Sequence, residues 1–99
     1  MNIRIQPSAD ADVRRGFQFY ESQETGIGAY FLDSIHSDID SLQLYAGIHR
    51  QVGELFRFRS LRFPYWIYYR IDGESCFVVA VLDARQAPFG DPTQGKPGK

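Results

Sequence analysis

Arginine and aromatic side chains interleave in residues 55–70 of this 99-residue chain. The segment holds four arginines and seven aromatic residues: Arg57, Arg59, Arg62 and Arg70 with Phe56, Phe58, Phe63, Tyr65, Trp66, Tyr68 and Tyr69. A guanidinium group binds a carboxylate or a phosphate through forked hydrogen bonds, and an aromatic ring offers a face for stacking. Rings at alternate strand positions are mostly core, and arginines opposite them are mostly a solvated face. Four arginines nevertheless exceed what solubility requires, so we interpret the cluster as a binding face.

Residues for other chemistries are sparse. His36 falls in a predicted helix, where we expect a solvent-facing or interhelical position, and His49 falls in a polar connection, where we expect solvation. An exposed loop histidine such as His49 is also a candidate general base. Neither metal nor nucleotide cofactor is expected, because no ligand cluster has metal-site spacing and Gly26-Ile27-Gly28 is too short to cradle phosphates. A single cysteine, Cys76, suits a reducing cytoplasm.

Charge is balanced overall but segregated along the chain. The net charge is −1 and the isoelectric point is near 6.0, whereas a protein that mainly grips phosphates carries a clear basic excess. Residues 1–54 hold eight acidic and four basic side chains, and residues 55–99 hold four acidic and seven basic ones. This asymmetry favours an acidic partner for the arginine-rich segment. No apolar run approaches the ~20 residues of a membrane span, so we expect a cytoplasmic protein.

Two helices are predicted in the first half, after a short strand over Asn2–Gln6. Ser8 is a natural N-cap for the first helix, which carries apolar residues every three or four positions to about Glu24. A break at Thr25-Gly26 precedes a second helix that ends near Gly47. The tight turn between them predicts an antiparallel helix pair.

Three strands are predicted in the second half, over residues 55–61, 64–71 and 76–82, after a polar connection at 46–54. Asp72-Gly73 between the last two is a strong hairpin signal, since both central residues of a type I′ turn need positive φ. The order β-α-α-β-β-β predicts an α+β fold, with a helix pair on one side of a small antiparallel sheet whose other side is open. Residues 1–88 form the predicted domain, and 89–99, rich in glycine and proline, an irregular tail.

Three segments together resemble the RelE/ParE superfamily of toxins from type II toxin–antitoxin modules, also called plasmid stabilisation proteins. They are FYESQETGIGAYFLDSI at the helix junction, RFRSLRFPYWIYYRI in the sheet and VVAVLDARQAP at its end. The resemblance runs from about Ile3 to Pro88 and implies the fold derived above. It also implies a cognate antitoxin whose disordered, acidic C-terminal segment neutralises the toxin in a hetero-oligomeric complex.

The superfamily contains two activities, and this sequence leans to one of them. RelE-like members are ribosome-dependent mRNA endoribonucleases that use basic residues and often a C-terminal tyrosine, whereas ParE-like members inhibit DNA gyrase. Lysine occurs only at Lys96 and Lys99, and no tyrosine follows Tyr69. The resemblance therefore favours a ParE-like gyrase inhibitor that is not an enzyme. A ribonuclease, or a weakly toxic protein that only binds antitoxin, remains the alternative.

The resemblance also implies site residues. Antitoxin carboxylates are expected to meet Arg57, Arg59, Arg70 and Arg85, with Tyr68 beside them; in the ribonuclease alternative Arg57, Arg59 and Arg85 are the catalytic residues. Relatives usually close with two adjacent arginines, and here Gln86 and Ala87 follow Arg85. These departures leave open whether toxicity is retained.

Overall fold

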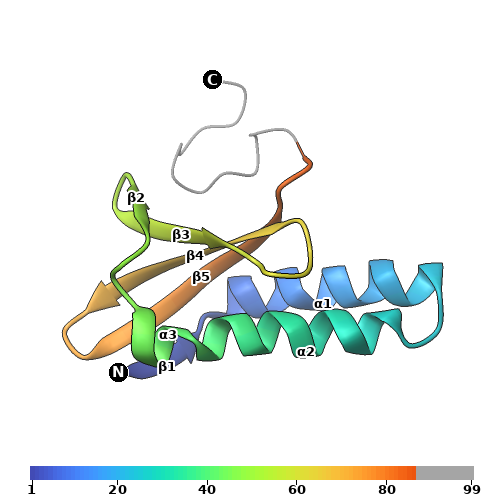
Figure 1. The fold of residues 1–99 in the computed structure, drawn as a ribbon, viewed down its shortest axis with the longest axis horizontal. Coiled ribbons are helices and arrows are strands. Elements are labelled where there is room, and N and C mark those ends of the chain that lie inside the picture. Colours follow the sequence, from blue (N-terminus) through green and yellow to red (C-terminus); the bar gives the residue numbers. More distant parts are fainter. Residues whose placement is uncertain (87–99) are drawn as a thin grey trace.

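Two long helices pack on one side of a five-stranded sheet in the computed structural model, which describes residues 1–86 (Figure 1). The strands are β1 (Asn2–Ile5), β2 (Arg50–Val52), β3 (Leu55–Arg59), β4 (Tyr65–Asp72) and β5 (Ser75–Asp83). The helices are α1 (Pro7–Gln23), α2 (Ile27–Asp40) and the single turn α3 (Leu42–Tyr45). The predicted α+β class is confirmed, and the predicted tail over residues 89–99 lies outside the described part of the chain.

The sheet has the order β1-β5-β4-β3-β2, and it is mixed. Neighbouring strands are antiparallel except β1, which lies parallel to β5, so the prediction of a purely antiparallel sheet was wrong at this edge. The alternation of apolar residues identifies a strand but not its neighbour, and β1 pairs with a strand some seventy residues later in the chain. Strand β2, within the connection predicted at 46–54, is short and polar and shows no such alternation.

Both predicted helices exist, but their ends differ from the prediction. Pro7 occupies the first turn of α1, where its fixed φ suits the helix and its missing N–H is harmless, so Gln6 and not Ser8 is the N-cap. The second predicted helix divides at Ser41, whose Oγ donates to the Asp38 carbonyl at 2.6 Å, and α3 follows. Gly26, with φ of 97°, makes the turn between α1 and α2.

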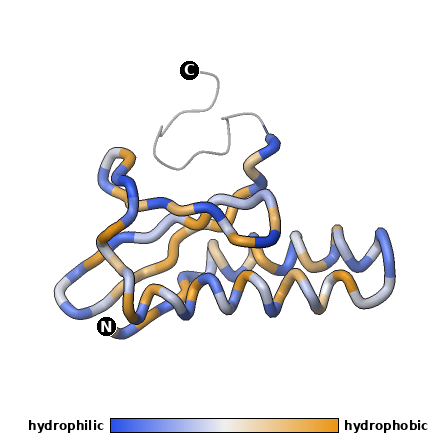
Figure 2. Tube along the Cα trace, viewed as in Figure 1, coloured by the Kyte–Doolittle hydropathy of each residue, from blue (hydrophilic) through white to orange (hydrophobic). Residues whose placement is uncertain are grey.

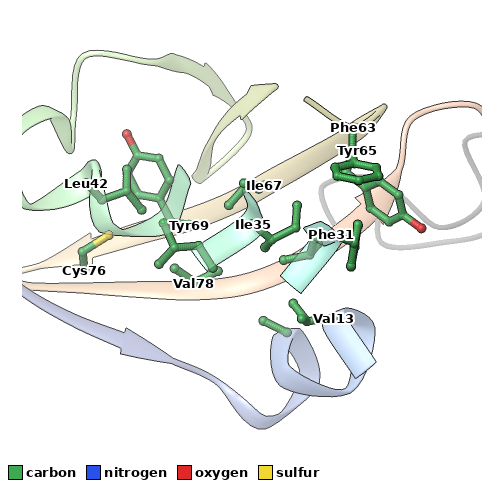
Figure 3. Close-up of a cluster of buried hydrophobic side chains, with 13 residues drawn as sticks. Val13, Phe31, Ile35, Leu42, Phe63, Tyr65, Ile67, Tyr69, Cys76 and Val78 are labelled. Atoms are coloured by element: carbon green, nitrogen blue, oxygen red, sulfur yellow. The ribbon is translucent and has the colours of Figure 1, made fainter. Parts of the chain in front are cut away.

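The core lies between the helix pair and the sheet (Figure 3). Apolar residues of the helices, including Phe31 and Ile35, pack against alternate residues of β4 and β5. Hydrophobic and hydrophilic residues alternate along α1 and α2, whereas the middle of β5 is continuously hydrophobic (Figure 2). A register shift in the β4–β5 ladder, beside Tyr68 and Tyr69, turns both Val78 and Val81 toward the helices although they are three residues apart.

The two long helices approach each other closely at a glycine of α1. A Cβ atom at Gly16 of α1 would lie 2.4 Å from Cζ of Phe31 in α2. At the turn, the Glu21 carboxylate accepts hydrogen bonds from the backbone N–H groups of Gly26 and Gly28, at 3.1 and 2.9 Å. A carboxylate at the N-terminus of a helix also meets the positive end of its dipole. No helix within residues 1–86 is long and apolar enough to cross a membrane.

We predict that Gly16→Ala lowers the free energy of unfolding by about 1–3 kcal/mol, because the new methyl group must displace the fully buried Phe31 ring. This effect opposes the gain of about 1 kcal/mol that alanine brings to a helix. Urea unfolding measures it, with Gln18→Ala on the exposed side of α1 as the control, expected within about 0.5 kcal/mol of the parent. A Gly16→Ala variant as stable as the parent would contradict the close helix contact.

Candidate functional site

The face of the sheet that points away from the helices carries most of its arginines. Cross-strand partners point to the same side of a sheet, and successive residues of a strand point to opposite sides. Phe56, Ile67 and Tyr69 pack toward the helices, so their strand neighbours point away. We call the resulting surface the open face. Its central part comprises Arg4, Arg50, Arg57, Arg59, Trp66, Tyr68, Arg70, Phe77, Ala80 and Leu82, and Asp72 lies on the same side at the hairpin end.

The strand register arranges these side chains in three rows across the sheet. Arg50, Arg57, Tyr68 and Ala80 form the first row, Arg59, Trp66 and Leu82 the second, and Arg4, Phe77 and Arg70 the third. The structure thus places four of the five predicted site residues on one face. Arg57 is directly opposite Tyr68, and Arg59 is directly opposite Trp66.

Guanidinium groups and rings are in contact on the open face. The Cζ atoms of Arg57 and Arg59 lie 4.0 and 5.5 Å from the centroid of the Trp66 ring, and Cζ of Arg70 lies 4.3 Å from that of Phe77. Such cation–π contacts contribute about 0.5–2 kcal/mol each. The central role of Trp66 was missed from the sequence, although its alternation with Tyr68 and Arg70 places it on the same face.

The guanidinium group of Arg57 is fixed by neighbouring side chains, but one of its N–H groups has no hydrogen-bond partner among the described residues. Its Nη1 donates to Oη of Tyr68 at 3.3 Å, and Tyr68 itself is only 2% exposed. The Nε atom of Arg57 is buried and has no hydrogen-bond partner within residues 1–86. A buried N–H without an acceptor is energetically unfavourable, so an acceptor supplied from outside the described residues would gain free energy there.

The arginines of the open face also lack strong acidic partners in the described part of the chain. Ion pairs of 3.0 Å or less involve Arg14, Arg15 and Arg85, none of which lies on this face. Arg70 has an exposed carboxylate, that of Asp72, no closer than 4.0 Å. Among the described residues, the open face therefore carries several guanidinium groups and has no ion pair shorter than 4.0 Å.

Arg85, the fifth predicted site residue, lies apart from the other four. Its Nε and Nη2 donate to the two carboxylate oxygens of Asp83 at 2.9 and 2.8 Å, which lowers the pKa of Asp83. Its Nη2 also donates to Oη of Tyr20 in α1, at 3.3 Å. Asp83 is opposite Tyr65, whose ring packs in the core, so this pair belongs to the helix side of the sheet.

The expectation that His49 is merely solvated was wrong. Its Nδ1 lies 2.6 Å from Oη of Tyr69, and its ring stacks on Phe58 with a centroid separation of 4.5 Å. The backbone N–H of Gly47 also donates to Oη of Tyr69, at 2.9 Å. Burial lowers the pKa of His49. The sequence showed only a polar segment here, since the partner Tyr69 is twenty positions away.

His49 therefore does not share a site with the open-face arginines. Its ring partners Phe58 and Tyr69 pack on the core side of the sheet, whereas Arg57 and Arg59 point to the other side. His36 is exposed on α2, as predicted. Within residues 1–86, no group of three or more histidine, cysteine, aspartate or glutamate side chains is placed to hold a metal ion.

Comparison with known proteins gives a family and a fold. Residues 3–88 match the family model described as the ParE toxin of the type II toxin-antitoxin system parDE. A chain of a solved structure, described as the chromosomal ParDE TA system from P. aeruginosa, superposes with a TM-score of 0.78 at 16% sequence identity. The match covers 86% of the present chain and 97% of that one, and it shows a shared fold. No curated protein sequence matches the chain.

We predict that the partly buried His49, paired with Tyr69, makes stability depend on pH. Because the pKa of His49 is lower in the native protein than its ordinary value of 6.5, the unfolded chain binds the proton more tightly. The free energy of unfolding should be highest above pH 6.5 and should fall as the pH drops from there to the native pKa.

Urea unfolding between roughly pH 7.5 and pH 5 tests this prediction, because the linkage relation equates the slope with the difference in bound protons. The variant His49→Gln should lose this part of the slope, whereas His36→Gln, which removes the exposed histidine, should retain it. Equal slopes in the parent and in His49→Gln would show that the His49–Tyr69 contact is not the cause of the pH dependence.

Proposed function

This chain belongs to the ParE toxin family of type II toxin–antitoxin systems, and we propose that an antitoxin neutralises it at the open face and that, once free, it inhibits DNA gyrase. The observation that carries the antitoxin part is the set of guanidinium groups on the open face without close acidic partners among the described residues. The gyrase part rests on the family and on the resemblance to its ParE-like members.

An acidic antitoxin segment suits the open face chemically. Carboxylates would pair with Arg57, Arg59 and Arg70, which the sheet holds in fixed positions by stacking on Trp66 and Phe77. A guanidinium already fixed by packing loses less side-chain entropy when it binds a carboxylate. The buried Nε of Arg57 supplies a further donor. A disordered segment can fold on such a surface and meet the cost of ordering through these contacts.

The helix pair offers apolar surface for the same segment. Phe19 of α1 is 48% exposed, and Tyr30 of α2 is 49% exposed. An amphipathic segment could cover these rings while its acidic side chains reach the sheet. Arg85 is left out of this contact, since its guanidinium is already paired with Asp83.

The described residues offer less support for mRNA cleavage. The ribonuclease alternative requires Arg57, Arg59 and Arg85 around one phosphate, with His49 as a distant base. The open face holds the first two, the helix side of the sheet holds Arg85, and the core side holds His49. We therefore propose gyrase inhibition as the activity.

We predict that the double variant Arg57→Gln/Arg59→Gln binds the antitoxin encoded beside this protein at least about tenfold more weakly, because each lost charge-assisted hydrogen bond contributes about 1.5–3 kcal/mol. Isothermal titration calorimetry measures the dissociation constant. The charge-matched control Arg14→Gln/Arg62→Gln removes two exposed arginines outside the strands and should bind normally. Equal affinity of both double variants would reject the open face as the binding surface.

We predict that the purified full chain, free of antitoxin, inhibits gyrase supercoiling, and that added antitoxin reverses the inhibition. Supercoiling of relaxed plasmid is scored on agarose gels, together with any linear DNA trapped in the enzyme complex. Absence of inhibition at large molar excess would contradict the gyrase target. Cleaved mRNA in a purified translation reaction would then support the ribonuclease alternative.

A further inference from the structure

β1 forms one edge of the sheet, and no strand of the described residues pairs with its outer side (Figure 1). On its inner side, the N–H groups of Asn2 and Gln6 donate to carbonyl groups of β5, each at 2.9 Å. Because successive N–H groups of a strand point in opposite directions, Ile3 and Ile5 direct their N–H and C=O groups away from β5. Such a row of unpaired backbone groups can pair with a further strand.

The continuation of this edge is covered by side chains, whereas β1 itself is not. Beyond the end of β1, Ser8 Oγ of helix α1 donates to the Val79 carbonyl of β5 at 2.7 Å. Farther along, Asp12 Oδ2 accepts from the Val81 N–H at 2.9 Å. Among the described residues, no side chain forms a hydrogen bond of this kind with the outer side of β1. The unshielded part of the edge is therefore β1.

Exposed apolar side chains accompany this free edge. Ile3 packs against the core, and side chains at alternate positions of a strand share a face, so Met1 and Ile5 project to the helix side as well. Met1 is 49% exposed and Ile5 is 41% exposed. The turn α3 lies beside β1 and adds Leu44, which is 81% exposed. The edge thus offers apolar surface together with unpaired backbone groups, and the removal of both from water favours association.

We propose that β1 pairs with β1 of a second copy of this chain, in antiparallel orientation about a two-fold axis at Ile3. In this register the backbone groups of Ile3 bond to those of the partner's Ile3. Ile5 is opposite the partner's Met1, and Met1 is opposite the partner's Ile5. The two exposed apolar side chains at the ends of the strand therefore cover each other. This mutual fit is the reason to place a second copy on the edge.

The charges of the edge also fit a second copy. Arg4 is the one charged residue in Asn2–Ile5, and it lies on the open-face side. With the axis at Ile3, Arg4 is opposite the partner's Asn2, whose Oδ1 can accept from the guanidinium group. An axis at Arg4 would place two guanidinium groups directly opposite each other, which is unfavourable. The net charge of −1 also gives little repulsion between two copies.

An acidic partner is better served by the open face, which carries several guanidinium groups, than by this edge with one. The two-fold axis is perpendicular to the joined sheets, so both open faces point to one side and both helix pairs point to the other. The dimer leaves the open face of each copy accessible. It therefore depends on neither the antitoxin proposal nor the gyrase proposal.

The first test is analytical ultracentrifugation of the purified full chain without antitoxin, where we expect a concentration-dependent equilibrium between monomer and dimer. Ile5→Lys places an ammonium group against the partner's Met1 and should weaken the dimer at least about tenfold, because a charge loses its hydration there. The matched control Leu61→Lys makes the same change at a residue that is 84% exposed in the loop between β3 and β4. It should dimerise as the parent does.

Substitutions at the exposed Asn2 test the register without changing the core. Asn2→Asp brings a carboxylate opposite the partner's Arg4, and the symmetry makes this contact twice, so the dimer should tighten about two- to tenfold. Asn2→Arg brings like charges together and should weaken the dimer by a similar factor. Equal dissociation constants for the two variants would reject the axis at Ile3.

Hydrogen exchange followed by NMR identifies the strand that pairs. The outward N–H groups of Ile3 and Ile5 should exchange quickly in dilute protein and slowly at concentrations where the dimer forms. Three results would overturn the proposal: a monomer at every concentration, equal dimer stability in Ile5→Lys and Leu61→Lys, or exchange at these two amides that does not change with concentration. Slow exchange that appears only when antitoxin is added would also overturn it, because an antitoxin strand would then occupy the edge.

Discussion

The burial of β5 under α1 is the interaction on which the rest of the structure depends. β5 lies between β1 and β4, and it turns Cys76, Val78 and Val81 toward the helices. Each such side chain contributes about 1.5–3 kcal/mol when fully removed from water. The register shift beside Val79 keeps this apolar row continuous while the strand twists. Because the helices cover one face of the sheet in this way, only the other face remains available for contacts with other molecules.

The packing of one face of the sheet against the helices also determines which side chains lie on the open face. Once Ile67 and Tyr69 point to the core, Trp66, Tyr68 and Arg70 must point away, since side chains alternate along a strand. The guanidinium groups stack on rings that belong to the sheet itself, so they are positioned by the fold. The buried Nε of Arg57 has no hydrogen-bond partner among residues 1–86, and a buried N–H without an acceptor is energetically unfavourable.

Helix α1 has a second role beyond hydrophobic packing. Ser8 and Asp12 form hydrogen bonds with backbone groups of β5 that a longer β1 would have paired. Gly16, four positions after Asp12, has no side chain and so lets α2 approach α1 closely. The close helix contact is thus a consequence of one residue without a side chain. Two Asp–Arg pairs lie near this region, whereas the arginines of the open face have no acidic partner closer than 4.0 Å among the described residues.

The sequence by itself determined the elements whose signals are local. Alternation of Phe56 and Phe58 with Arg57 and Arg59 predicted a strand with one apolar and one basic side, and Asp72-Gly73 marked the hairpin, where Gly73 has φ of 62°. Apolar residues at helical spacing predicted the helix pair. These patterns need no knowledge of any distant residue, and they also carried the resemblance that the family model confirms.

Only the tertiary structure decided which distant groups meet. The parallel pairing of β1 with β5, the contact of His49 with Tyr69 and the separation of Arg85 from Arg57 each depend on how the whole sheet is ordered. Side-chain periodicity specifies which face a residue occupies within its own element, but it does not specify which elements become neighbours. For the same reason the sequence showed the arginines of the open face but gave no indication that Ser8 and Asp12 would bind the backbone of β5, some seventy residues later in the chain.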